Sequence, residues 1–242
     1  TTGGNMSVAE VRLQVGANSY SGNATSGIFA WGAQLSASGS VDPYYANAAA
    51  APASSAFQGP RIDYDPVTLA CRGLLIEESR QNVALYSSDF DNAAWSKLRS
   101  TVIPNVIVAP DGTLTADKLA EQTDAATNRN VGQNISITAG STYTWSVFAK
   151  AAERSAINMR FASGFPAGNV TFDLIAGTAT ALANVVASSI TPLANGWYRC
   201  RTTAATAWCW TRSWPNCRTN LWPGTSATTW PAPWHWWKPA WG

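Results

Sequence analysis

Short segments in which apolar and polar residues alternate, separated by turn-forming residues, recur along this chain and constrain its fold more than any other feature. Alternation sends successive side chains to opposite faces of a β-strand, whereas helical periodicity is weak throughout. We expect strands at residues 8–15, 28–35, 73–77, 101–108, 115–120, 131–137, 142–150, 156–162, 169–174, 178–190 and 197–203. Many short strands at regular spacing predict an all-β fold, a jelly-roll β-sandwich.

Composition excludes two classes of partner. Charged residues make up only 12% of the 242 residues, and the formal net charge is +2. Without a cluster of Lys and Arg, we predict no nucleic-acid partner. Since no apolar run approaches about 20 residues, we also predict no membrane span.

The four cysteines, Cys71, Cys200, Cys209 and Cys217, do not form a metal-binding pattern with the single His235. A disulfide between Cys209 and Cys217 and structural thiols are both compatible with the spacing. We expect Cys71 and Cys200 to be buried free thiols, because free cysteine is commonly buried.

Changes in amino-acid composition and patterning along the chain predict four parts. Residues 1–35 form a strand pair, residues 36–60 are an Ala-, Ser- and Pro-rich linker, and residues 61–205 form the main sandwich. Residues 206–242, the tail, hold nine of the 13 Trp and no acidic residue. The tail is either a Trp platform for sugars or a membrane interface, or an out-of-frame or cloning-derived extension.

Five motifs carry a family resemblance: Gly-Leu-Leu-Ile-Glu-Glu at 73–78, Ser-Ser-Asp-Phe-Asp-Asn-Ala-Ala-Trp at 87–95, Ala-Pro-Asp-Gly-Thr at 109–113, Thr-Ala-Asp-Lys-Leu at 115–119 and Asn-Gly-Trp-Tyr-Arg-Cys at 195–200. With them, the chain resembles β-sandwich modules of phage tail fibres and other virion surface proteins. More loosely, it is similar to jelly-roll carbohydrate-binding modules of secreted glycosidases.

The order of the module is unusual. Residues 26–35, Ser-Gly-Ile-Phe-Ala-Trp-Gly-Ala-Gln-Leu, resemble its closing strand, yet they precede the rest. A sandwich that lacks its last strands has open edges, which pair readily with other strands. The segments at 8–15 and 27–35 are suited to fill this gap, within the chain or from a neighbour. We therefore predict either one permuted sandwich or a strand-exchanged homo-oligomer.

The resemblance implies a non-catalytic module on a virion surface or in an extracellular protein that recognises a glycan or polysaccharide. One alternative is a purely structural fibre repeat that mediates assembly. A second is a hydrolase acting on polysaccharide or ester substrates. The chain has no Gly-x-Ser-x-Gly motif, and adjacent Glu77 and Glu78 would point to opposite faces of a strand.

Sugar recognition by a sandwich needs aromatic rings together with side chains that hydrogen-bond hydroxyl groups. The candidate ligand-binding residues are Trp95, Asn128, Arg129, Asn158, Arg160 and Trp197. Asn158 and Arg160 alternate with apolar residues, so we expect them to share the solvent face of one strand. Trp197 follows a turn and has a core position as its alternative.

Four aspartates suggest a metal site. The resemblance to jelly-roll modules implies one structural Ca²⁺, with Asp89, Asp91 and Asp117 as candidate ligands and Asp111 nearby in the sequence. Their spacing does not match the Asp-x-Asp-x-Asp-Gly loop. The alternative is that these aspartates form turns and cap backbone amides.

Overall fold

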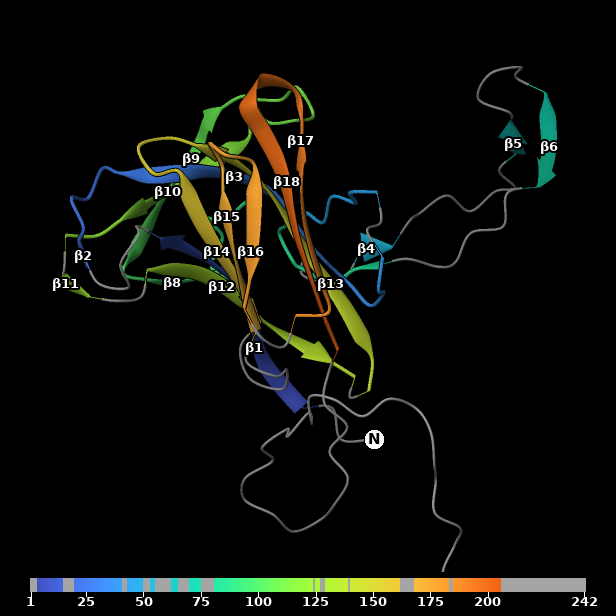
Figure 1. Ribbon diagram of the computed structural model, residues 1–242, viewed down its shortest axis with the longest axis horizontal. Helices are drawn as coiled ribbons and strands as arrows, with labels where there is room; N and C mark the ends of the chain where they lie inside the picture. The colour runs from blue at the N-terminus through green and yellow to red at the C-terminus, as the bar shows by residue number, and fades with distance from the viewer. Residues whose placement is uncertain are drawn as a thin grey trace, which may run out of the picture. The chain divides into compact units, whose positions relative to one another are not determined.

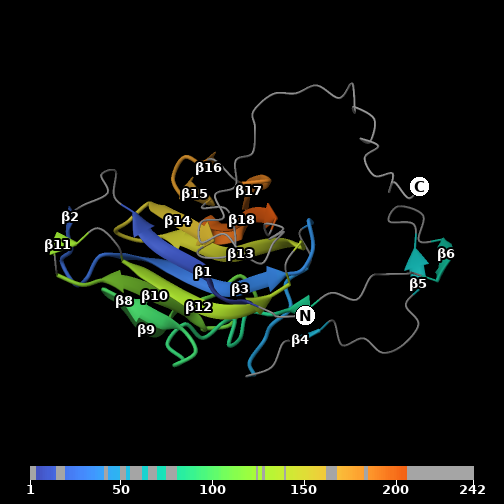
Figure 2. The same cartoon turned by 90° about the horizontal axis from the view of Figure 1, so that it is seen from below.

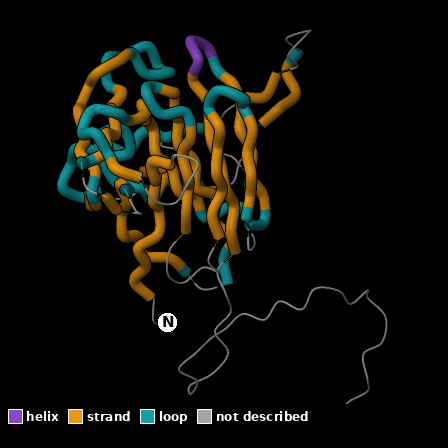
Figure 3. The backbone as a smooth tube through the Cα atoms, turned by 60° about the vertical axis from the view of Figure 1, so that its left-hand side comes forward, coloured by secondary structure: helices purple, strands orange, loops and turns teal. Residues whose placement is uncertain are grey.

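The computed structural model describes residues 4–14, 20–40, 43–49, 53–54, 62–64, 70–74, 81–123, 125–126, 129–138, 140–161, 168–182 and 185–205. Two antiparallel six-stranded sheets pack against each other (Figures 1 and 2), which confirms the predicted all-β sandwich. The described residues contain no α-helix, and a short 3₁₀ turn, Ala194–Gly196, is their one helical segment (Figure 3). No helix in this part of the chain could cross a membrane.

The first sheet has the strand order β16-β15-β14-β1-β12-β8. Its strands are β16 (Thr178–Ala181), β15 (Gly168–Asp173), β14 (Ala156–Phe161), β1 (Gly4–Gln14), β12 (Asn130–Ile137) and β8 (Ser96–Leu98). The second sheet has the order β17-β18-β13-β3-β10-β9. Its strands are β17 (Ala187–Pro192), β18 (Trp197–Ala205), β13 (Thr142–Ala151), β3 (Gly27–Ser36), β10 (Ala116–Glu121) and β9 (Ser100–Ile107).

Three two-stranded ladders accompany the sheets. They pair β2 (Tyr20–Ser21) with β11 (Ala125–Ala126), β4 (Ala53–Ser54) with β7 (Gln81–Asn82), and β5 (Ile62–Tyr64) with β6 (Cys71–Leu74).

The two early strands lie in the interior of the sheets. β1 pairs with β12 on one side and β14 on the other, so that Val11 stands opposite both Val131 and Met159. β3 likewise lies between β13 and β10. Both early strands therefore lie between other strands of the same chain, one in each sheet.

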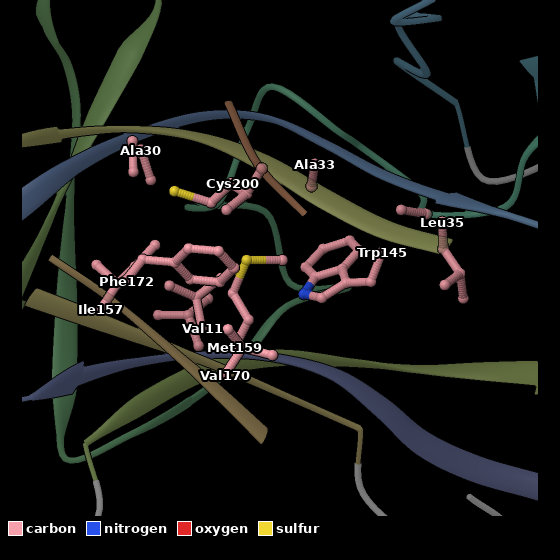
Figure 4. Packing of buried hydrophobic residues seen from close by; sticks show 14 of the residues in the cluster. Val11, Ala30, Ala33, Leu35, Trp145, Ile157, Met159, Val170, Phe172 and Cys200 are labelled. Atoms are coloured by element: carbon pink, nitrogen blue, oxygen red, sulfur yellow. The ribbon is translucent and has the colours of Figure 1, made fainter. Parts of the chain in front are cut away.

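The core fills the space between the sheets. Figure 4 shows Val11, Met159 and Phe172 of the first sheet meeting Trp145 and Cys200 of the second, and each is at most 1% exposed. Burial of one large aromatic side chain contributes about 4–6 kcal/mol, at roughly 25 cal/mol per Å² over 150–250 Å². Burial of the apolar side chains, which alternation directs to one face of each strand, thus provides the main driving force for folding.

Most predicted strands lie within a few residues of the observed ones. The largest difference is at residues 178–190, where the structure has two strands, β16 and β17, instead of one. Leu182 and Val186, between them, are exposed, so these apolar residues belong to a surface connection.

Part of the predicted linker packs against the sandwich. The Tyr44 ring lies 4.6 Å from the Trp31 ring and 5.6 Å from the Phe148 ring, measured between centroids. Asn47 is buried, and its backbone N–H donates to Ser87 Oγ at 2.8 Å. Residues 43–49 of the predicted linker thus contact the sandwich through their aromatic and amide side chains.

The cysteine predictions are partly corrected. Cys200 is a buried free thiol, as expected, whereas Cys71 is exposed. Cys71 belongs to the two-stranded β5–β6 ladder rather than to either large sheet, so no opposing sheet covers it. Cys209, Cys217 and the rest of the tail lie outside the described residues.

Candidate functional site: a polar face and an arginine pair

Asn158 and Arg160 lie on the outer side of β14. The residues that alternate with them, Ile157, Met159 and Phe161, are at most 1% exposed and belong to the core. The predicted alternation is therefore confirmed. Asn158 is nevertheless 7% exposed, because its neighbours cover most of its side chain.

Neighbouring strands place further polar side chains beside these two. Asn158 stands between Arg12 of β1 and Thr171 of β15, and Arg160 stands between Glu10 and Asn169 in the next row. We call these six residues the polar face: Glu10, Arg12, Asn158, Arg160, Asn169 and Thr171.

Hydrogen bonds hold part of the polar face in place. Asn158 Nδ2 donates to Thr171 Oγ1 at 3.1 Å and to Asn169 Oδ1 at 3.4 Å. Arg12 Nη2 forms an ion pair with Glu10 Oε2 at 2.9 Å. Arg160, by contrast, has no hydrogen-bond or ion-pair partner among the described residues. The face presents ordered amide and carboxylate groups beside one guanidinium that is available to a ligand.

Trp95 occupies the core instead of the surface. It is 1% exposed, its ring lies 4.8 Å from that of Phe90 and 6.3 Å from that of Trp145, and its Nε1 donates to Tyr86 O at 3.0 Å. This position corrects the expectation of a sugar-stacking ring, since neither face of the indole reaches solvent.

Two further predicted ligand residues are buried. Trp197 is 2% exposed and donates from Nε1 to Val108 O at 3.2 Å, as its core alternative requires. Arg129 is 1% exposed, and its Nε donates to Gln122 O at 3.4 Å. The prediction of Arg129 as a ligand-binding residue is corrected, because its guanidinium is buried and donates to a backbone carbonyl. Asn128 lies outside the described residues.

Asp117 joins the turn at Phe90 to strand β9 from a buried position. It is 1% exposed, and its carboxylate accepts the backbone N–H of Phe90 at 2.8 Å and that of Asn105 at 3.0 Å. Burial raises the pKa of Asp117 to about 6, with a smaller contribution from the negative charges of Asp89 and Asp91. These contacts match the turn and capping alternative.

The other aspartates do not complete a metal site around Asp117. Asp89 accepts the backbone N–H of Asn92 at 3.2 Å within a turn, and Asp91 is exposed. Within the described ranges, no three acidic, His or Cys side chains are arranged to hold a metal ion. The calcium prediction therefore gains no support from this geometry.

The structure also reveals a pair of arginines that the sequence analysis missed. Arg199 and Arg201 lie on the outer side of β18, opposite Phe148 and Ser146 of β13. Arg199 Nη2 donates to Ser146 Oγ at 3.2 Å, and its Cζ lies 5.3 Å from the centroid of the Phe148 ring. Burial and the charge of Arg201 lower the pKa of Arg199. The signal was present in the sequence, because Arg199 and Arg201 alternate with Cys200, a residue suited to the core.

His235, Glu77 and Glu78, on which the hydrolase alternatives depend, all lie outside the described residues. Comparison with known protein families, with curated proteins and with solved structures finds no match to this chain. The functional conclusion therefore depends on the two outer faces of the sandwich and on the chemistry of their side chains.

Proposed function

We propose that this protein is a non-catalytic glycan-recognition module. The observation that carries the proposal is the polar face, on which three adjacent strands bring a carboxylate, amides, a hydroxyl and guanidinium groups into register. Adjacent strands are about 4.8 Å apart, so donors and acceptors recur at the scale of hydroxyl groups on a sugar chain. The resemblance to virion surface modules supports placing it on a virion surface or in an extracellular protein.

The chemistry of the polar face favours recognition of a ligand over catalysis. Asn158 is fixed by two side-chain hydrogen bonds, and the Glu10–Arg12 pair is fixed by its own. Preorganised polar groups lose little conformational entropy when a ligand binds, which favours recognition of hydroxyl groups. Arg160 has unused donors that a sugar hydroxyl or carboxylate would accept.

A glycan array tests the proposal, with the purified chain run in calcium and in chelator. We expect binding with dissociation constants between about 1 µM and 1 mM. Binding should weaken at least about fivefold in Arg160→Ala and Asn158→Ala, as expected for loss of one or two hydrogen bonds. Lys150→Ala, on β13 of the other sheet, is the control and should bind as the wild type does. A folded, monodisperse protein that binds no glycan would refute the proposal.

A specific observation favours the structural fibre repeat as the second candidate. β9 is an edge strand of the second sheet, and Ile103 and Val106 on it are 46% and 39% exposed. Exposed apolar residues on an edge strand favour pairing with another chain. Light scattering coupled to size-exclusion chromatography decides between the candidates. Assembly that Ile103→Lys abolishes supports the fibre repeat, whereas a monomer at all concentrations rejects it.

A further inference from the structure

Arg199 and Arg201 are two residues apart on β18, so both side chains leave the same outer face of the second sheet. Their Cα atoms are separated by about 7 Å along the strand. Across the ladders, Arg201 stands opposite Ser146 of β13 and Ser189 of β17, while Arg199 stands opposite Phe148. Two guanidinium groups thus share a small area bordered by hydroxyl groups and an aromatic ring.

Arg201 has unused hydrogen-bonding capacity in a partly desolvated place. The Nε of Arg201 is buried and has no hydrogen-bond partner, and this side chain forms no ion pair with a described acid. A buried donor that lacks an acceptor costs free energy. Burial, and to a smaller extent the positive charge of Arg201, lower the pKa of Arg199, so two guanidinium charges without an anion are disfavoured here. An anion at this position would relieve both costs.

We infer that Arg199, Arg201 and Ser146 form a binding site for an oxyanion, namely a carboxylate or phosphate group carried by an acidic polymer. Guanidinium forks bind the paired oxygens of such groups through parallel charge-assisted hydrogen bonds. Ser146 Oγ accepts from Arg199, which leaves its own O–H to donate to the same anion. This site lies on the second sheet, so it does not depend on the glycan-binding role of the polar face on the first.

The aromatic neighbour of Arg199 orients its guanidinium group. Phe148 is 7% exposed and packs with Trp31 and Tyr44, which keeps its ring fixed beside the Arg199 guanidinium. An aromatic ring beneath a guanidinium group keeps the plane of that group oriented. The side chain therefore loses less conformational entropy when it binds an anion.

The first test observes the guanidinium directly in the wild-type chain. The Nε–Hε resonances of ¹⁵N-labelled arginines are followed by NMR while inorganic phosphate is added at constant ionic strength. We expect a saturable shift of the Arg201 signal and no comparable shift of Arg99, an exposed arginine between β8 and β9. An unchanged Arg201 signal, or equal shifts of both signals, overturns the inference.

The second test uses variants and polymers. Arg201→Gln and its control Arg99→Gln remove the same charge, and each is titrated with polygalacturonate, poly(glycerol phosphate) and neutral dextran. Arg201→Gln should weaken binding of an acidic polymer about tenfold or more, and Arg99→Gln less than about twofold.

The outcomes of these titrations identify the anion and test whether the site exists. The polymer that responds identifies the source of the anion, a carboxylate or a phosphate. Binding of the acidic polymers that is unchanged in Arg201→Gln, or weakened equally in Arg99→Gln, overturns the site. If Arg201→Gln does not fold, the wild-type phosphate titration decides the question.

Discussion

Asn82 connects segments that are far apart in the sequence, and its replacement by Asp tests how much that connection contributes to stability. The side chain is fully buried. Its Oδ1 accepts the backbone N–H of Leu35 at 3.2 Å and of Ala84 at 3.0 Å. Its Nδ2 donates to the carbonyl oxygens of Ala33 at 3.1 Å and of Tyr45 at 2.8 Å. β3, the packed part of the predicted linker and the segment after β7 therefore meet at one amide.

The expected loss follows from these four bonds. Asn82→Asp has the same shape, so it leaves no cavity, but at neutral pH it directs a negative oxygen at two carbonyl oxygens. Each net hydrogen bond contributes about 1 kcal/mol, and a buried group left unsatisfied costs about 1–3 kcal/mol. Loss of two bonds with two unsatisfied carbonyls gives about 4–8 kcal/mol, a large part of the roughly 5–15 kcal/mol of a typical domain.

Urea unfolding followed by tryptophan fluorescence measures this loss. At about 1–3 kcal/mol per molar urea, the midpoint should fall by at least about 1 M. Asn134→Asp, at an exposed position of β12, is the control and should leave the midpoint nearly unchanged. If Asn82→Asp remains within about 0.5 kcal/mol of the wild type, the amide does not hold these segments together and the reasoning fails.

Three further changes test other parts of the structure. Because the folded pKa of Asp117, about 6, lies above its ordinary value of 3.8, the native state binds the proton more tightly. Stability should fall by at most about 3 kcal/mol as pH rises from 4 to 6, and Asp117→Asn should remove that fall in urea unfolding. Gly27→Ala would place a Cβ 2.1 Å from Leu119 O and should cost at least about 1–3 kcal/mol by calorimetry; wild-type stability would contradict the close approach of β3 and β10. Burial raises the pKa of the Cys200 thiol, so iodoacetamide should modify exposed Cys71 and spare Cys200 until urea is added, as read by peptide mass spectrometry.

Alternation predicts the strands because burial on one side of a strand leaves a period of two in the sequence. The same period separates the core-facing Tyr143, Trp145 and Val147 from the outward-facing Thr144, Ser146 and Phe148 of β13. Short strands such as β8 escape prediction, since three residues carry too little pattern. In a strand that is long enough to show the alternation, this pattern alone therefore predicts which face of the sheet each side chain lies on.

The residues that cover each face of a strand could not be predicted from the local sequence. Trp95 and Arg129 are suited to a binding surface by residue type, yet both are buried, Trp95 against Phe90 and Trp145 and Arg129 beside Gln122. Asn82 and Asp117 are polar residues of kinds common in turns, and their burial depends on backbone amides and carbonyls from elsewhere in the chain. Such contacts have no local signature, because the partner is a peptide group that every residue possesses.

The central place of β1 links the completeness of the sandwich to its function. Without β1, the first sheet would separate into β16-β15-β14 and β12-β8, each with a newly open edge. The same strand provides Glu10 and Arg12, which form one side of the polar face beside Arg160 and Asn158. Whether β1 comes from its own chain or from a neighbouring copy, the sheet that it completes and the surface that it provides are the same. A module that lacks this strand would lose stability and, under the proposed function, glycan recognition together, whereas the arginine pair on β18, which is flanked by β13 and β17, would lose only the support of the first sheet.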